Sequence, residues 1–110
     1  MFVYNITLNM EYGIEVEALI WVENIFIPYV MKRGIFHEFQ LCKLNFIDQY
    51  TPAYAIQFYC SNDADKDLLL EKGQTQYIEM VLEKWGLQVM PFATIMDIMK
   101  PAYLSFIHQN

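Results

Sequence analysis

The side chains that could carry chemistry are thinly spread along this chain, and none of them forms a recognised catalytic motif. His37 and His108 are the only histidines, and neither stands at a spacing that pairs it with a second metal ligand. Cys42 and Cys60 lie too far apart for a CxxC metal or redox motif. We therefore predict no metal ion and no cofactor, and we interpret both cysteines as small apolar residues that are buried on folding.

The strongest candidate for a binding site is a set of polar side chains on three predicted strands. Residues 2–10 alternate strictly, with large apolar residues at the even positions, which indicates a strand with one buried face. The runs 35–46 and 53–60 are rich in β-branched and aromatic residues and add further strands. The face turned away from the core is expected to carry Val3, Asn5, Thr7, Asn9, Glu38, Gln40, Cys42, Ala53, Ala55, Gln57 and Tyr59.

This polar face has two possible roles. A polar pocket would form there if two such sheets closed face to face, and its candidate residues are Asn5, Glu38, Gln57 and Tyr59. Alternatively, the face is solvated or forms a wet dimer interface.

Two amphipathic helices are predicted to cover the other face of the sheet. In the first, which lies between Gly13 and Gly34, Pro28 should kink the helix or end its regular part. Its apolar residues at helical spacing are Ile14, Ala18, Trp21, Val22, Ile25 and Tyr29. The second is capped by Ser61 or Asn62 and stops at Gly86. Its predicted buried stripe is Leu70, Tyr77, Ile78, Val81, Leu82 and Trp85.

The order of these elements predicts the fold. A last strand runs from residue 87 to about residue 98, and Pro91 within it favours an edge position or a bulge. With a hairpin loop at 47–52, the order becomes β-α-β-β-α-β, an α+β ferredoxin-like plait. Its four-stranded antiparallel sheet carries two helices on one face, and its first and third strands are central.

Length and composition limit the possible classes of protein. The 110 residues are expected to form one domain spanning 1–110, with an apolar tail over 100–110 that docks on the domain or on a partner. The net charge of −6 argues against a nucleic-acid partner. The longest stretch without charged residues, 49–62, contains Pro52 and is shorter than the roughly 20 residues of a membrane span. The first residues lack a signal-peptide pattern, so we expect a cytoplasmic protein.

The apolar content predicts a homodimer. Hydrophobic residues make up 55% of the chain, and helices on only one sheet face should leave Val3, Phe36, Tyr59 and the tail residues Phe106 and Ile107 uncovered. Burying an extra 1,000 Å² or so would contribute on the order of 25 kcal/mol before the costs of association. Pairing the open sheet faces about a two-fold axis would cover these residues.

Several short motifs, taken in order, resemble a known family. They are Tyr4-Asn5-Ile6-Thr7, Trp21, Ile27-Pro28-Tyr29-Val30-Met31, Gly34-Ile35-Phe36, Tyr54-Ala55-Ile56-Gln57-Phe58-Tyr59 and Phe92-Ala93-Thr94-Ile95-Met96. Together they resemble an uncharacterised bacterial family, the domain-of-unknown-function family 4286, as far as Met99. The resemblance implies a ferredoxin-like fold of the dimeric α/β-barrel type and no established activity.

Two functions follow from these observations. The first is a homodimeric binding or structural module that takes a small hydrophobic or aromatic ligand. The alternative is a monooxygenase-like enzyme, because Asn5 with Trp85 is similar to the Asn and Trp of haem-degrading monooxygenases of the dimeric α/β-barrel type. The haem-ligating His of those enzymes is missing from the second helix, so the alternative covers a cofactor-free as well as a haem-dependent reaction.

Overall fold

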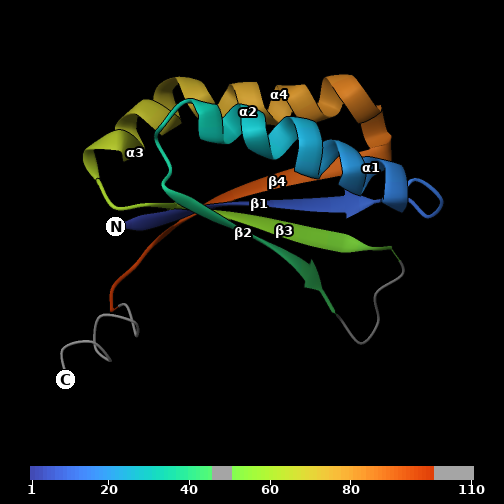
Figure 1. The fold of residues 1–110 in the computed structure, drawn as a ribbon, viewed down its shortest axis with the longest axis horizontal. Coiled ribbons are helices and arrows are strands. Elements are labelled where there is room, and N and C mark those ends of the chain that lie inside the picture. Colours follow the sequence, from blue (N-terminus) through green and yellow to red (C-terminus); the bar gives the residue numbers. More distant parts are fainter. Residues whose placement is uncertain (46–50, 101–110) are drawn as a thin grey trace.

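Four strands form one sheet, and every helix lies on the same face of it (Figure 1). The computed structural model describes residues 1–45 and 51–100. The strands are β1 (Phe2–Met10), β2 (Glu38–Leu44), β3 (Ala53–Cys60) and β4 (Val89–Asp97). The helices are α1 (Glu15–Trp21), α2 (Ile27–Lys32), α3 (Ala64–Leu68) and α4 (Gln74–Trp85), and Gly86–Gln88 form a short 3₁₀ turn.

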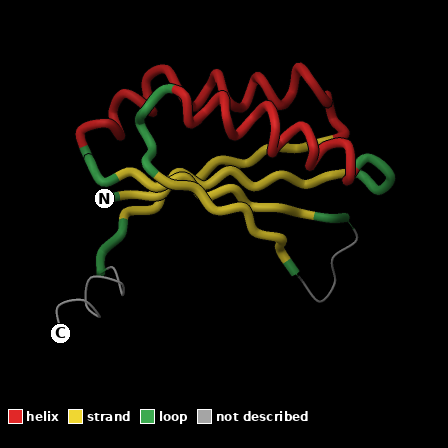
Figure 2. The backbone as a smooth tube through the Cα atoms, in the orientation of Figure 1, coloured by secondary structure: helices red, strands yellow, loops and turns green. Residues whose placement is uncertain are grey.

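The sheet topology confirms the ferredoxin-like plait. The strand order is β2-β3-β1-β4 and all three neighbouring pairs are antiparallel, so β1 and β3 are central. Pro91 lies on the edge strand β4, where the sheet tolerates its missing N–H. The helices and the sheet form two layers (Figure 2). Most of the predicted hairpin loop, residues 46–50, and the tail residues 101–110 lie outside the described residues.

The second strand is shorter than predicted. It begins at Glu38 rather than at residue 35, because Phe36 turns into the core and is buried. The Phe36 ring stacks on Tyr4 of β1 at a centroid distance of 6.0 Å. The expectation that Phe36 needs a second subunit to cover it is therefore wrong.

A wide turn changes which residues of the first helix are buried. Residues Val22–Phe26 between α1 and α2 form a π-helical turn, in which the Ile27 N–H bonds to the Val22 carbonyl. Pro28 directly follows and cannot complete an α-helical hydrogen bond, so it interrupts the regular helix without ending it. The extra residue of the π turn shifts the buried stripe by one position. The prediction that Ile25 and Tyr29 are buried is wrong, and the residues buried in their place are Phe26, Ile27 and Val30.

The second helical segment, which runs from α3 to α4, also contains a π turn. A π turn at Leu69–Gly73 lies between α3 and α4, and the buried residues follow one another four apart as Leu69, Gly73, Tyr77 and Val81. Leu70, predicted to be buried, is exposed. The residue that flanks the start of α3 is Asp63, whose side chain makes no cap hydrogen bond, whereas the Asn62 Oδ1 accepts a hydrogen bond from the Ala64 N–H at 3.0 Å.

The core lies between the two layers and is strongly aromatic. The even residues of β1 are almost completely buried, and they are Phe2, Tyr4, Ile6, Leu8 and Met10. Trp21 and Trp85 meet edge to face at 6.1 Å above the sheet. The described part of the chain contains no helix long and apolar enough to cross a membrane.

Candidate functional site

The face of the sheet that carries no helix is the predicted polar face, and the strand register orders it into four rows. Each row takes one residue from β2, β3, β1 and β4 in turn. The rows are Glu38-Tyr59-Val3-Met96, Gln40-Gln57-Asn5-Thr94, Cys42-Ala55-Thr7-Phe92 and Leu44-Ala53-Asn9-Met90. All eleven residues predicted to lie on this open face are in these rows.

The four candidate pocket residues are close neighbours in the register. Asn5 lies opposite Gln57, and Glu38 lies opposite Tyr59. The Tyr59 hydroxyl lies 3.2 Å from the Gln57 side-chain oxygen and 3.3 Å from that of Gln40. Asn5 donates its side-chain N–H to the Thr7 hydroxyl at 3.1 Å. The second row therefore forms a band of hydrogen-bonding groups across all four strands.

The exposed large apolar residues of the open face come from β4, whose outward face the sequence pattern left unassigned. Met90, Phe92 and Met96 are exposed there, whereas Val3, expected to be uncovered, is buried by its neighbours. The strand period of two places 90, 92, 94 and 96 on one face, but residues 89–96 are apolar on both faces except at Thr94, so polarity gave no signal of which face is exposed.

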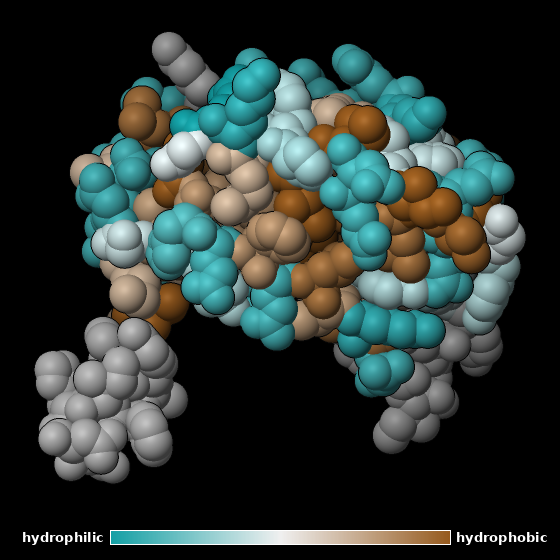
Figure 3. Space-filling view, in the orientation of Figure 1, coloured by the Kyte–Doolittle hydropathy of each residue, from teal (hydrophilic) through white to brown (hydrophobic). Residues whose placement is uncertain are grey.

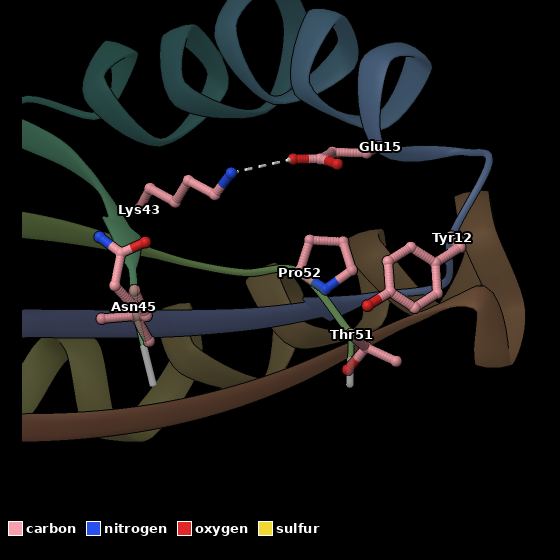
Figure 4. Close-up of a pocket in the computed structure, with 7 residues that line it drawn as sticks. Tyr12, Glu15, Lys43, Asn45, Thr51 and Pro52 are labelled. Atoms are coloured by element: carbon pink, nitrogen blue, oxygen red, sulfur yellow. Dashed lines mark ion pairs between the residues drawn. The ribbon is translucent and has the colours of Figure 1, made fainter. Parts of the chain in front are cut away.

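A hollow of about 260 Å³ opens at the end of the sheet, where α1 begins, β2 ends and β3 begins (Figure 4). Lys43 of β2 and Glu15 of α1 point toward one another across it. The Lys43 Nζ is 3.9 Å from the Glu15 Oε1. The lining residues are Tyr12, Glu15, Lys43, Leu44, Asn45, Thr51 and Pro52.

A buried tyrosine holds the carboxylate at the wall of this hollow. Tyr54 is only 7% exposed, and its hydroxyl donates a hydrogen bond to the Glu15 Oε1. Burial, together with the hydrogen bond to Glu15 and the negative charge of that carboxylate, raises the pKa of Tyr54 to about 12. The ammonium group of Lys43 lies 6.0 Å from the centre of the Tyr54 ring. The phenol therefore stays protonated and donates to Glu15 throughout the physiological pH range.

No sequence motif pointed to this hollow. Its charged residues come from α1 and β2 and are separated by most of the first helix and the turn after it. Only the alternation of β3 hinted that Tyr54 faces the helices, opposite Leu8 of β1.

The histidine and the Asn–Trp pair do not assemble a metal or haem site within the described residues. His37 is exposed, and no group of three or more His, Cys, Asp or Glu side chains in residues 1–45 and 51–100 could hold a metal ion. Asn5 lies on the open face, whereas Trp85 packs with Trp21 in the helix layer on the other side of the sheet. The similarity to haem-degrading monooxygenases is therefore not matched by the placement of this pair.

Residues 1–99 match the family model described as a domain of unknown function, DUF4286. The chain belongs to this family. The DUF4286 match covers all four strands and all the helices of the described structure. No curated protein matches the DUF4286 chain.

Solved structures share the fold of this DUF4286 domain at very low sequence identity. An ethyl tert-butyl ether d (EthD) family protein from Bacillus halodurans superposes with a TM-score of 0.61 at 11% identity, over 90% of this chain and 100% of that one. A protein from an uncultured marine organism, described as a dimeric ferredoxin-like protein, gives 0.63 at 9% identity, over 92% and 97%. HapK from Hahella chejuensis gives 0.58 at 8% identity, over 92% and 95%. These similarities establish the ferredoxin-like fold.

Proposed function

We propose that the protein is a homodimeric binding module in which the open sheet faces of two copies meet and enclose a small hydrophobic or aromatic ligand. The observation that carries this proposal is the composition of the open face. Glu38 is the only charged residue among the sixteen positions of its four rows, whereas 18% of the whole chain is charged. Depletion of charge is a property of the core of protein interfaces.

The exposed apolar residues on β4 support the same arrangement. Phe92 is 55% exposed, and Met90 and Met96 flank it on the same strand. Aromatic residues and methionine are enriched at interfaces, and a two-fold axis would bring this edge against the same face of a second copy. The similar fold of a protein described as dimeric is consistent with this pairing.

The polar row supports a ligand rather than a dry interface. Amides enclosed between two sheets need hydrogen-bond partners, because an unpaired buried polar group costs about 1–3 kcal/mol. The row Gln40-Gln57-Asn5-Thr94 and the neighbouring Tyr59 and Glu38 would supply donors and acceptors, and the aromatic and methionine side chains of β4 would contact an apolar ring. The candidate pocket residues Asn5, Glu38, Gln57 and Tyr59 therefore stay our proposed contacts.

The test of the dimer is a matched pair of charge substitutions. Phe92 on the open face and Ile20 on the first helix are each 55% exposed, so replacing either by Glu buries a similar amount of new charge if its surface is covered. We expect the wild type to have twice the 13.1 kDa mass of one chain in sedimentation at micromolar concentration. The Phe92→Glu variant should sediment with the 13.1 kDa mass of a single chain, whereas the Ile20→Glu variant should keep the mass of the dimer.

Two results would contradict the proposed dimer. One is a wild type that sediments with the mass of a single chain. The other is dissociation by Ile20→Glu but not by Phe92→Glu, which would place the interface on the helix layer. Hydrophobic residues are also visible among hydrophilic ones over the helix layer (Figure 3). Circular dichroism of both variants checks that the fold is retained.

A further inference from the structure

The hollow between Glu15 and Lys43 lies apart from the polar band of the open face, and its charges are arranged for a particular kind of ligand. It presents one carboxylate and one ammonium group side by side. Charge-assisted hydrogen bonds between such groups are about 2.7–2.9 Å long, so the 3.9 Å separation leaves the Lys43 N–H donors without a hydrogen bond to Glu15. The ammonium can therefore take another acceptor.

A hydrogen bond from a buried residue holds the Glu15 side chain in place. The buried Tyr54 hydroxyl donates to the Glu15 Oε1, and the side chain of Glu15 is itself only 32% exposed. Lys43, in contrast, is 57% exposed and can reach toward solvent or toward a ligand. The site thus consists of a carboxylate held through its Oε1, whose other oxygen accepts no hydrogen bond from the described residues, and a more exposed ammonium group beside it.

The paired charges select against simple ions. Because the two charged groups are only 3.9 Å apart, a carboxylate bound to Lys43 would be repelled by Glu15. An amine bound to Glu15 would likewise be repelled by Lys43. A ligand that carries an ammonium and a carboxylate group close together can place its ammonium at Glu15 and its carboxylate at Lys43, and it is then attracted at both ends. An α-amino acid has this arrangement, because its ammonium and carboxylate groups are attached to one carbon.

The rest of the lining suits the side chain of a small amino acid. Pro52 and the ring of Tyr12 supply apolar surface, and the Asn45 amide lies on the same wall as Lys43. The volume of about 260 Å³ is close to the lower end of the range for ligand pockets, which is about 300 Å³. We propose that this hollow binds the zwitterionic head of a small apolar α-amino acid, with the ammonium on Glu15 and the carboxylate on Lys43.

The test compares leucine with its two halves. Titration of the full-length protein followed by two-dimensional NMR would use L-leucine, 4-methylpentanoate, which lacks the amino group, and 3-methylbutylamine, which lacks the carboxylate. We expect leucine to shift the amide signals of residues around Glu15 and Lys43, and each half to bind at least about 10-fold more weakly, which corresponds to about 1.4 kcal/mol.

Substitutions then assign the two charges. Lys43→Gln and Glu15→Gln should each weaken leucine binding about 10-fold or more, and Tyr54→Phe should weaken it while keeping the ring. Lys84→Gln is the matched control, because the Lys84 ammonium lies over the Trp85 ring at 5.4 Å and does not line the hollow. Phe92→Glu should leave leucine binding unchanged, which separates this inference from the proposed dimer.

Three outcomes would overturn the inference. They are the absence of leucine-induced shifts at millimolar concentration, equal binding of leucine to the wild type and to Lys43→Gln, and binding of either half as tightly as leucine. Because Lys43 is largely exposed, Lys43→Gln is expected to fold, so a loss of binding in that variant reports on the site.

Discussion

Replacing Tyr4 by phenylalanine should stabilise this protein, although removing a buried side-chain hydroxyl usually does the opposite. Tyr4 lies at the centre of the core on β1, with none of its surface exposed. Its hydroxyl has no hydrogen-bond partner among the described residues. The ring is stacked on Phe36 and on Phe58 and contacts Tyr77 at 6.1 Å, so the packing does not depend on the oxygen.

The magnitude follows from the cost of an unpaired polar group. A buried hydroxyl without a partner costs about 1–3 kcal/mol, whereas a phenylalanine of the same shape leaves only a small void. We therefore expect Tyr4→Phe to increase the free energy of unfolding by about 1 kcal/mol. For a domain of this size, that gain raises the Tm by about 4 °C.

The pH dependence provides a second readout. Burial, followed by the charge of a deprotonated Tyr77, raises the pKa of Tyr4 above its usual value. Because the folded pKa is higher than the unfolded one, the stability of the wild type is fully present below about pH 10 and falls as the pH rises above it. The Tyr4→Phe variant has no hydroxyl to ionise at this position, so the difference between its free energy of unfolding and that of the wild type should grow at alkaline pH.

Urea denaturation followed by circular dichroism at pH 7 and at pH 10.5 would measure both effects. Tyr59→Phe is the control, because that hydroxyl is hydrogen-bonded and sits on the open face, so its removal should be neutral or slightly destabilising. A loss of 1 kcal/mol or more for Tyr4→Phe at pH 7 would refute the reasoning, since it would mean that the hydroxyl is satisfied within the core.

Three further predictions concern the site wall and the helices. Because the pKa of Tyr54 is raised to about 12 in the folded state, the free energy of unfolding of the wild type should fall by up to about 2–3 kcal/mol between pH 10 and pH 12. Alkaline denaturation curves of Tyr54→Phe should lack this loss. Gly73→Ala should not raise the free energy of unfolding by the usual helix-propensity gain of about 1 kcal/mol. A Cβ at this position would lie 3.1 Å from Leu69 and 3.4 Å from Tyr77, which are both fully buried. A clear rise in Tm would contradict this prediction. Gly86→Ala should lower stability by about 1–2 kcal/mol in thermal melts, because its φ of +59° ends α4 in a conformation that disfavours a Cβ, and an unchanged Tm would argue against that strain.

The strand pattern made much of the open face predictable. Alternation along 2–10 and 53–60 placed Asn5, Gln57 and Tyr59 on one face, and the antiparallel register then brought them together. The buried faces of the two helices were less predictable, because each π turn adds one residue and moves the stripe, as Ile25 and Leu70 illustrate. A π turn has no composition of its own that distinguishes it from an ordinary helical turn.

The sequence by itself determined the order of the elements, the face of each central strand and the edge position of Pro91, because these follow from local periodicity and from the missing N–H of proline. Only the tertiary structure decided that Glu15, Lys43 and Tyr54 meet at one end of the sheet. Their contact depends on how far α1 extends over the ends of β2 and β3, and that position is set by the packing of the whole core rather than by any short segment.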